Sequence, residues 1–489
     1  FCIFIPATNP TCYYMKFYQV DAIQRITPLN DQSMTAVERR AVSALSGLFG
    51  LRMLGLFLIL PVFVLYAREL EGQTPVLVGI ALGAYGLTQA LFQIPFGMLS
   101  DRFGRKPIIS IGLLIFAFGS VVAAMADSIL WVIIGRALQG SGAITAAILA
   151  LTADLTRESQ RTKAMAIIGG TIGTAFALAF ILGPLLDRWI GVPGLFWMTG
   201  LLALAALPVL WFMVPHAVIS THHSDTQPAM YQFSAVLKDP QLIRLDVGIF
   251  ILHFVLTAIF VIVPIALMEN IGLDRGDHWK IYISVLSLSI IGIAPIIRYG
   301  QHRDLVRKLF LICLTLLIGG LLLIYVGIDS YYGIAFGLWV FFVGFNGLEI
   351  MLPSLMSRLA PAGSKGTAIG VYNTFEFSGI FVGGTLGGLI YGAYGLQGVI
   401  LLSTLMLIVW LIVAVTAPQQ KLFDSLQIGF TLQSDDSKQF TNGLVGLPGV
   451  AEVTVMVNEE VAYLKVDPAL FDNEKLERVA NEAGVTLKN

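Results

Sequence analysis

The chain has few charged residues and no excess of basic side chains. Only 12% of its 489 residues are Asp, Glu, Lys or Arg, whereas 56% are hydrophobic and the mean hydropathy is +0.80. A soluble globular protein carries about twice that share of charge, so this composition excludes a soluble protein and places most of the chain in lipid. The formal net charge of −1 gives no basis for nucleic-acid binding.

Cysteine is also scarce, and no nucleotide-binding loop is present. The three cysteines, Cys2, Cys12 and Cys313, form no CxxC pair, so they indicate neither a disulfide framework nor a thiolate metal site. We therefore predict no metal and no cofactor. Because the sequence contains no GxxxxGK[ST] loop, ATP hydrolysis is not expected to drive the protein, and we predict that it is not an enzyme.

Residues 1–33 lack the basic start and the apolar core of a signal peptide. Met34 opens a more ordinary beginning, in which Arg39 and Arg40 precede the first long apolar run. A translation start at Met34, with 1–33 as a non-native extension, is a hypothesis that mass spectrometry of the natural N-terminus would settle. We assign 1–42 to an N-terminal cytoplasmic segment.

Twelve apolar runs are long enough to cross a bilayer, which requires roughly 20 residues. We predict an all-α membrane protein with twelve transmembrane helices. The runs are 43–67, 77–99, 108–126, 129–154, 163–186, 194–214, 245–268, 279–299, 307–327, 331–357, 365–393 and 397–417.

Basic residues predict the orientation of these spans. Fourteen lie on one side and only four, Arg68, Arg188, Arg275 and Lys280, on the other. Because cytoplasmic loops are enriched in Lys and Arg, we predict a multi-pass protein of the inner (plasma) membrane with both termini in the cytoplasm.

A polar connection over 215–243 divides the spans into two six-helix halves, 43–214 and 244–417. It is predicted to be a cytoplasmic central loop. Two six-span halves are typical of secondary transporters, which hold substrate between the halves near the midplane of the membrane.

The loop between spans two and three carries a strong motif. It reads GMLSDRFGRKP over 97–107, and it resembles the G-x-L-x-D-R-x-G-R-K signature of the major facilitator superfamily. Gly97 allows close helix approach, and Gly104 allows a tight turn. In that family this loop latches the cytoplasmic ends of the two halves together. The resemblance implies a conformational latch made of Gly97, Asp101, Arg102, Gly104, Arg105, Lys106 and Asp154.

Two further segments extend the resemblance. RALQGSG over 136–142 is similar to the R-x-x-Q-G-x-G motif of the family, and Gly173 with Gly183-Pro184 is similar to its antiporter motif, although Leu185-Leu186-Asp187 departs from it. Together with segments such as 86–97 and 352–377, they resemble drug:proton antiporters that carry an appended cytoplasmic domain. The predicted kink or packing residues are Gly140, Gly173, Gly183 and Pro184.

Ionisable and amide side chains fall within the apolar spans, where an unpaired charge costs at least about 3 kcal/mol. Several are spaced three or four residues apart on one helix face, so we expect them to converge on a central cavity. Glu349 is the first candidate for proton coupling and Glu376 the second, while a structural role for His253 is as well supported. Arg52 and Arg136 are interpreted as substrate contacts or as static salt bridges. The full set is Arg52, Gln89, Gln93, Arg136, Gln139, His253, Asn346, Glu349, Tyr372, Asn373 and Glu376.

After Pro418 the sequence becomes mixed and polar, which predicts a cytoplasmic domain over 422–489. Alternating apolar residues indicate strands around 426–430, 453–457 and 461–466, and helical patterns cover 434–445 and 476–483. The order β-α-β-β-α-β is a small α+β, ferredoxin-like plan. LPGVAEV over 447–453 resembles heavy-metal-associated domains, but no cysteine is present in the 431–436 loop. The domain is expected to regulate, to dock within or between molecules, or to bind a cation through Asp435 and Asp436.

These observations leave three functions open. We predict a proton-coupled exporter of small organic or amphipathic molecules that works by alternating access. An uptake symporter for a sugar or an amino-acid-like substrate and a non-transporting membrane sensor are the alternatives. The expected partners are a small-molecule substrate, protons and the lipid bilayer.

Overall fold

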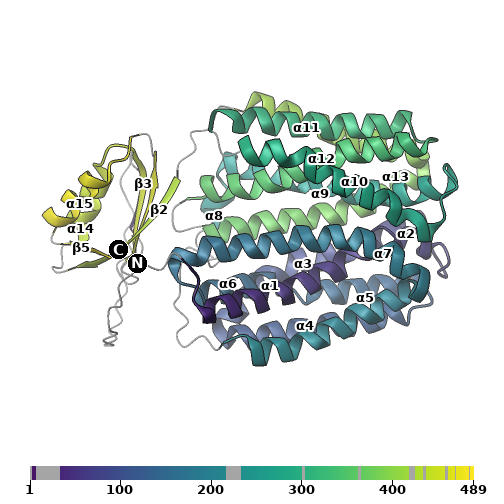
Figure 1. Cartoon of the computed structure of the whole chain (residues 1–489), viewed down its shortest axis with the longest axis horizontal. Coiled ribbons are helices and arrows are strands. Elements are labelled where there is room, and N and C mark those ends of the chain that lie inside the picture. The colour runs from purple at the N-terminus through teal and green to yellow at the C-terminus, as the bar shows by residue number, and fades with distance from the viewer. Residues whose placement is uncertain are drawn as a thin grey trace.

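The computed structural model describes residues 3–6, 33–215, 233–299, 303–361, 365–417, 424–432, 437–456, 461–467, 470–483 and 485–488. A bundle of long helices lies beside a small domain of strands and two helices, which is found at one end of the bundle (Figure 1). The described residues include the predicted chain start at Met34, but they leave out most of 1–33, the His222 and His223 region, the 433–436 loop, the 458–460 turn and Gly484.

The first half of the bundle begins with a capped helix. Thr35 accepts a hydrogen bond from the Glu38 backbone amide, and the Glu38 carboxylate accepts one from the Thr35 backbone amide, which is a capping box. The elements of this half are α1 (Ala36–Phe57), α2 (Phe63–Ala67), α3 (Pro75–Phe103), α4 (Arg105–Ala124), α5 (Ile129–Ser141), α6 (Thr145–Asp154), α7 (Glu158–Pro208) and the short π-helix η1 (Val209–Met213).

The second half is preceded by the short helix α8 (Phe233–Val236). Its long helix α9 has Asp239 as its N-cap and Pro240 as its first residue, an arrangement that favours helix initiation. The elements are α9 (Pro240–Glu269), the 3₁₀ turn η3 (Arg275–Asp277), α10 (His278–Tyr299), α11 (Arg303–Val326), α12 (Tyr331–Leu359) and α13 (Lys365–Thr416).

Within the described residues, ten helical segments are long and apolar enough to cross a membrane. Two of them, α7 and α13, exceed 50 residues and bend at Gly191 and Gly395, where φ is +66°. Each therefore makes two passes, so ten segments give the twelve spans that the sequence predicts. The first predicted span began too late, because α1 starts at Ala36 rather than at 43.

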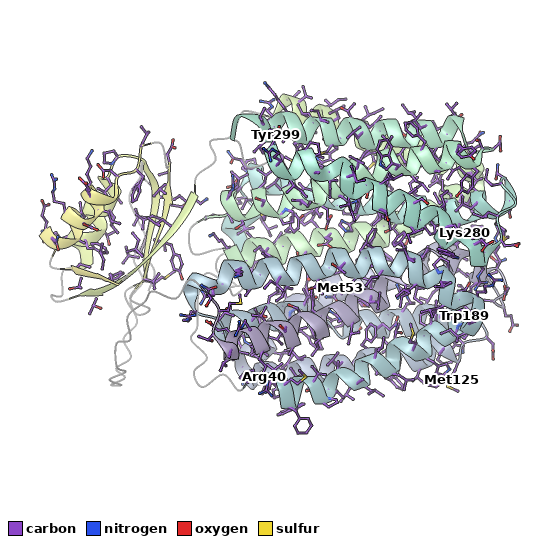
Figure 2. The ribbon with its side chains drawn as sticks, viewed as in Figure 1. Arg40, Met53, Met125, Trp189, Lys280 and Tyr299 are labelled. Carbon is purple, nitrogen blue, oxygen red and sulfur yellow. The ribbon has the colours of Figure 1, made fainter. Side chains whose placement is uncertain are left out.

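The two ends of the bundle can be followed in Figure 2. Arg40 and Tyr299 mark the end beside the small domain, which we call the tail-side end, and Met125, Trp189 and Lys280 mark the opposite or far end. Helices α9 and α13 both start at the tail-side end, and α12 finishes there.

Glycines allow α13 to pack tightly against both α3 and α9. A Cβ at Gly79 of α3 would lie 2.1 Å from a backbone atom of Gly384 in α13. A Cβ at Gly83 would lie 2.7 Å from a backbone atom of Phe381. On its other side, α13 presents Gly379 to Phe250 of α9. Small residues let transmembrane helices approach this closely, so α13 joins the two halves.

We expect Gly83→Val to destabilise the bundle, because its side chain would clash with the α13 backbone. Overpacking of this kind typically costs about 1–3 kcal/mol. Gly169→Val is the matched control, since a Cβ at Gly169 meets nothing within 4 Å. The measurement is thermal unfolding of both purified variants in detergent. Equal shifts in melting temperature would contradict the close approach.

The small domain has the predicted β-α-β-β-α-β order. Its elements are β2 (Asp424–Leu432), α14 (Ser437–Val445), β3 (Val450–Met456), β4 (Val461–Val466), α15 (Asn473–Glu482) and β5 (Val485–Lys488). The antiparallel strands lie in the order β3-β4-β2-β5, which is the ferredoxin-like arrangement. One strand was not predicted: β1 (Ile3–Pro6) pairs with β3 at the edge of the sheet.

The small domain contacts the tail-side end through Lys465 of β4. The Lys465 ammonium donates a hydrogen bond of 2.7 Å to the carbonyl of Leu359, the last residue of α12, and lies 3.7 Å from Glu452 within its own domain. Lys465 also interacts electrostatically with Lys365 and Asp239, at the starts of α13 and α9. Burial lowers the pKa of this ammonium, and Glu452 opposes the effect. The contact therefore involves the second half of the bundle.

Lys465→Met is expected to loosen this contact, because the Leu359 carbonyl loses its charged donor. A hydrogen bond to a charged group contributes about 1.5–3 kcal/mol, so the docked population should fall about tenfold or more. The measurement is the distance distribution between spin labels at Leu470 and Ile297, in protein whose cysteines are replaced by serine. Lys475→Met, on exposed α15, is the control. An unchanged distribution for Lys465→Met would show that other contacts hold the domain.

Candidate functional site

Arg52 and Arg136 lie inside the first half, where each is 3% exposed. Arg52 donates hydrogen bonds to the Gln89 side chain at 2.6 Å, to the Gly142 carbonyl at 2.7 Å and to Thr145 at 3.2 Å. Both guanidinium groups lie over the ring of Tyr85, at 5.9 Å and 5.3 Å from its centroid. Among the described residues, no carboxylate lies within ion-pair distance of either arginine. Of the two interpretations of these arginines, the static salt bridge is therefore not seen among the described residues.

Gln139 extends the same network. It accepts a hydrogen bond of 3.1 Å from Arg136 and donates one of 2.8 Å to Ser120 of α4. The contacts of the two arginines are therefore with amides, hydroxyls, a carbonyl and an aromatic face rather than with a counter-ion, and the Nε atom of each is buried without a hydrogen-bond partner among the described residues. This network is a preformed positive site within the first half.

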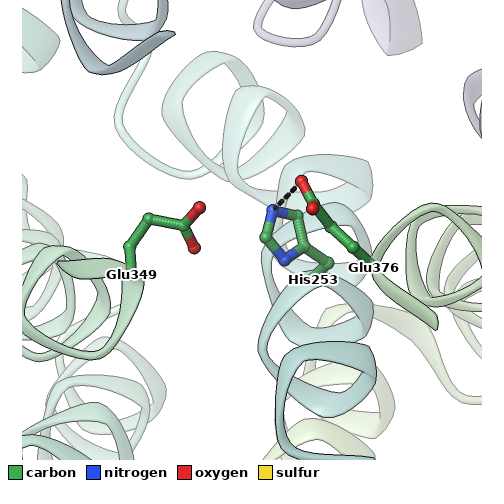
Figure 3. A group of neighbouring side chains, drawn as sticks. All are labelled: His253, Glu349 and Glu376. Carbon is green, nitrogen blue, oxygen red and sulfur yellow. Dashed lines mark ion pairs between the residues drawn. The ribbon is translucent and has the colours of Figure 1, made fainter. Parts of the chain in front are cut away.

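A second group of polar side chains lies inside the other half. His253 of α9, Glu349 of α12 and Glu376 of α13 point toward one another, and their nearest ligand atoms all lie within 4.8 Å (Figure 3). His253 Nε2 is 3.5 Å from Glu376 Oε1. In the described part of the chain, no lysine or arginine pairs with any of the three. We call this group the acidic cluster.

The ligand atoms of His253, Glu349 and Glu376 are close enough to hold a metal ion. Glu349 Oε2 is buried and has no hydrogen-bond partner among the described residues, so this oxygen could bind a metal ion or a proton. Two neighbouring carboxylates without a counter-ion cannot both remain charged at low energy. The arrangement is therefore suited to holding a proton between its acids.

The remaining predicted residues are distributed around these two groups. Gln93 crosses between the halves, donating to Thr374 at 2.8 Å and to the Gly370 carbonyl at 3.3 Å. Asn346 donates to Ser289 at 3.2 Å. The Tyr372 hydroxyl is buried without a partner among the described residues, and Asn373 is half-buried. Among the described residues, no hydrogen bond or ion pair joins the two arginines to the acids, and the shared cavity stays a prediction.

Contacts of the predicted latch stay within the first half. Arg105 forms an ion pair with Asp101 and donates to Asp154 at 3.1 Å, while Lys106 donates to the Val214 carbonyl at 2.6 Å. Gly104 has φ of +93° at the turn, and a Cβ at Gly97 would lie 3.2 Å from Ala146. Arg102 is exposed. Between described residues, none of these polar contacts reaches the second half.

The predicted kink and packing residues differ in their surroundings. A Cβ at Gly140 would lie 2.1 Å from the Tyr85 carbonyl oxygen, and one at Gly183 would lie 2.6 Å from that of Leu58. Both positions require glycine for close helix contact. Pro184 lies inside α7. The packing role predicted for Gly173 is not seen, since a Cβ there meets nothing within 4 Å.

Ion pairs between the halves lie at the far end. Arg275 of η3 forms a two-pronged ion pair with Asp187 of α7, and Arg68 pairs with Glu269 of α9. A pocket of about 500 Å³ adjoins the first pair and is lined by Tyr66 among others. Asp187 and the basic residues stand out separately in the sequence, but no sequence signal links positions this far apart.

Aromatic rings fill the space between these ion pairs and the acidic cluster. Phe176 and Phe180 of α7 contact Phe342 of α12, and Phe180 also contacts Phe260 of α9, with ring centroids 4.6–6.1 Å apart. Phe345, in the same group, lies 5.9 Å from the His253 ring. Because rings from both halves interlock, the far side of the acidic cluster is closed by packing as well as by charge.

One buried acid was missed. Asp246 of α9 is 0% exposed, and neither of its carboxylate oxygens has a hydrogen-bond partner among the described residues. It stands near the start of its span, where an acid is ordinarily expected to reach the membrane surface. The signal that could have found it is its spacing of seven residues from His253, which places both on one helix face.

Residues 45–384 match the family described as Major Facilitator Superfamily. The chain is 42% identical over 457 residues to the inner membrane transport protein YajR of Escherichia coli K12, covering 93% of this chain and all of that protein. It is 28% identical over 352 residues to the multidrug resistance protein MdtH of Proteus mirabilis, covering 68% and 82%. A solved bacterial homologue of the human lysosomal transporter Spinster has a TM-score of 0.65 at 14% identity, covering 78% and 98%.

Proposed function

Because this chain belongs to the major facilitator superfamily, we propose that it is a proton-coupled exporter of small organic or amphipathic molecules. Membership of this family makes it a membrane transporter, and the proposal concerns its energy source, direction and substrate. The observation that carries proton coupling is the acidic cluster, in which the half-buried Glu349 and Glu376 lie beside the buried His253 and no lysine or arginine among the described residues pairs with them. Desolvation and mutual repulsion favour binding of a proton there.

The contacts between the halves support alternating access. The far end is joined by Arg275–Asp187 and Arg68–Glu269, whereas the latch residues Arg105 and Lys106 contact their own half. This is the arrangement expected when solvent can reach the acidic cluster from the tail-side end. In the opposite state the far-end pairs would separate and the latch would engage the second half.

Export from the cytoplasm is favoured by orientation and by similarity. The surplus of basic residues at the tail-side end supports a cytoplasmic location of that end and of both termini. MdtH, a relative that covers most of the chain, is described as a multidrug resistance protein. A cluster of acids beside aromatic rings favours amphipathic molecules, in particular those that carry positive charge.

The test is proton movement in proteoliposomes that contain the purified full chain and a pH-sensitive dye. Ethidium, an aromatic organic cation, is the first probe, followed by a library of amphipathic compounds. Counterflow of protons against a compound would support the exporter. Proton flow in the same direction as the compound would overturn it in favour of an uptake symporter, and no coupled flow with any compound would overturn proton coupling.

A further inference from the structure

Asp246 is the buried acid that the proposed coupling mechanism leaves unused. Both its oxygens are enclosed without a hydrogen-bond partner in the described part of the chain. Taking an unpaired polar group out of water is costly, and a carboxylate in a spanning helix is a functional group by default. Its surroundings show which function it can serve.

The register of α9 against α13 places Asp246 next to known members of the site. Phe250, Phe254 and Ala258 of α9 lie opposite Gly379, Gly383 and Gly387 of α13. The offset between each of these pairs is constant, at 129 positions. Extended by one turn, the same register sets Asp246 level with position 375, between Tyr372 and Glu376.

Contacts of Tyr372 agree with this register. The Tyr372 side chain is 3% exposed, its hydroxyl has no partner among the described residues, and it interacts electrostatically with Glu349, Glu376 and Asp246. It is thus a neutral donor and acceptor that interacts electrostatically with three carboxyl groups. Among the titratable side chains on the packed helices α9, α12 and α13, Tyr372 is the one that links Asp246 to Glu349 and Glu376 in this way.

Position along α9 orders these groups across the membrane. Asp246 lies six residues from the helix start at Pro240, or about 9 Å from the tail-side end at 1.5 Å per residue. His253 lies seven residues deeper on the same face, about 10 Å farther from that end. Asp246 therefore stands between the tail-side solvent and His253, and by the same register it is level with the backbone beside Glu376.

We propose that Asp246 is a relay carboxyl that passes protons between the tail-side solvent and Glu349 and Glu376, with the Tyr372 hydroxyl as the bridge. This inference rests on the proposed proton coupling. In this structure the Tyr372 hydroxyl and the Asp246 oxygens have no hydrogen-bond partner among the described residues, so the transfer requires these side chains to move into hydrogen-bond contact. The Asp246 carboxyl then gives its proton to the tyrosine oxygen while the tyrosine gives its own proton to the Glu376 carboxylate. One O–H bond breaks and one forms at each step, so Asp246 becomes charged, Glu376 becomes neutral and Tyr372 is unchanged.

The experiment follows protons without requiring a substrate. The full chain in nanodiscs is acidified by photolysis of a caged proton, and the carbonyl stretch of protonated carboxyl groups is recorded by time-resolved infrared spectroscopy. Bands that disappear in Glu349→Gln or Glu376→Gln report the acidic cluster. In Asp246→Asn we expect those bands to reach the same amplitude, but about tenfold more slowly or slower still, because protons must then reach the acidic cluster without the relay carboxyl.

Rescue and a second variant separate a relay from a structural role. Asp246→Glu should restore the rate. Tyr372→Phe keeps the ring and should also slow the arrival of protons, so it carries the test if Asp246→Asn does not fold. Arrival of protons at the wild-type rate in Asp246→Asn, or in Tyr372→Phe where only that variant folds, would overturn the relay. Failure of the coupling proposal itself is different: the wild type would then show no band that depends on Glu349 or Glu376.

Discussion

Replacing Glu349 with glutamine is expected to abolish coupled proton movement while the protein stays folded in the membrane. Glutamine keeps the size and polarity of the side chain but binds no proton at this position. Because a positioned proton-transfer group typically contributes about 100-fold or more, we expect substrate-driven proton flux in proteoliposomes to fall on that scale. Glu376→Gln should act in the same direction, since both acids belong to the acidic cluster.

Glu71→Gln is the matched control for this experiment. Glu71 is exposed at the far end, so the same chemical change there should leave the flux unaltered. Substrate-driven proton flux at the wild-type level in Glu349→Gln would remove this residue from the mechanism. Loss of the protein from the membrane fraction would instead indicate a folding defect, in which case Glu376→Gln carries the test.

Breaking the Arg275–Asp187 pair should have the second large effect, on the balance between conformations. The Asp187 side chain is 3% exposed, and removing one partner of a buried pair costs about 3–5 kcal/mol. Because the pair joins the halves only when the far end is closed, Arg275→Ala is expected to favour the state open at that end by about 100-fold or more.

Spin labels can measure this change directly. Labels at Gln73 in the first half and Tyr332 in the second, in protein without its native cysteines, report the separation of the far ends. The distance should lengthen in Arg275→Ala and shorten again when Asp187→Arg is combined with Arg275→Asp. Lys280→Met is the control, because Lys280 pairs with Asp277 in its own half. A distance that is unchanged in Arg275→Ala would show that the remaining contacts, Arg68–Glu269 and the aromatic packing, are enough to close this end.

The spans and the small domain were predictable because each depends on a local pattern. Apolar runs of sufficient length must form helices in lipid, and alternation such as Val453 and Val455 must form strands with one buried face. The exceptions arise where distant segments decide the structure. Pairing of Ile3–Pro6 with β3 has no local signal, and the early start of α1 depends on the Thr35–Glu38 cap.

The candidate site could be predicted only in part. Glu349, Glu376 and His253 stand out because a charge in an apolar span demands an explanation, but their meeting at one point depends on how three helices are rotated and packed. Arg52 was grouped with them by the same logic, yet it donates its hydrogen bonds inside the first half, to Gln89 and Gly142 among others. A single helix pattern does not reveal which of two interior faces a side chain will join.

The attachment of the small domain has a mechanical consequence. Lys465 holds it to the Leu359 carbonyl and lies near the starts of α9 and α13, so these contacts involve the second half. When the halves rotate against each other, a domain attached in this way moves with the second half as a rigid extension of it. The outer helices α14 and α15 would then move farther than any helix in the bundle. The position of the domain would therefore report the conformational state of the transporter.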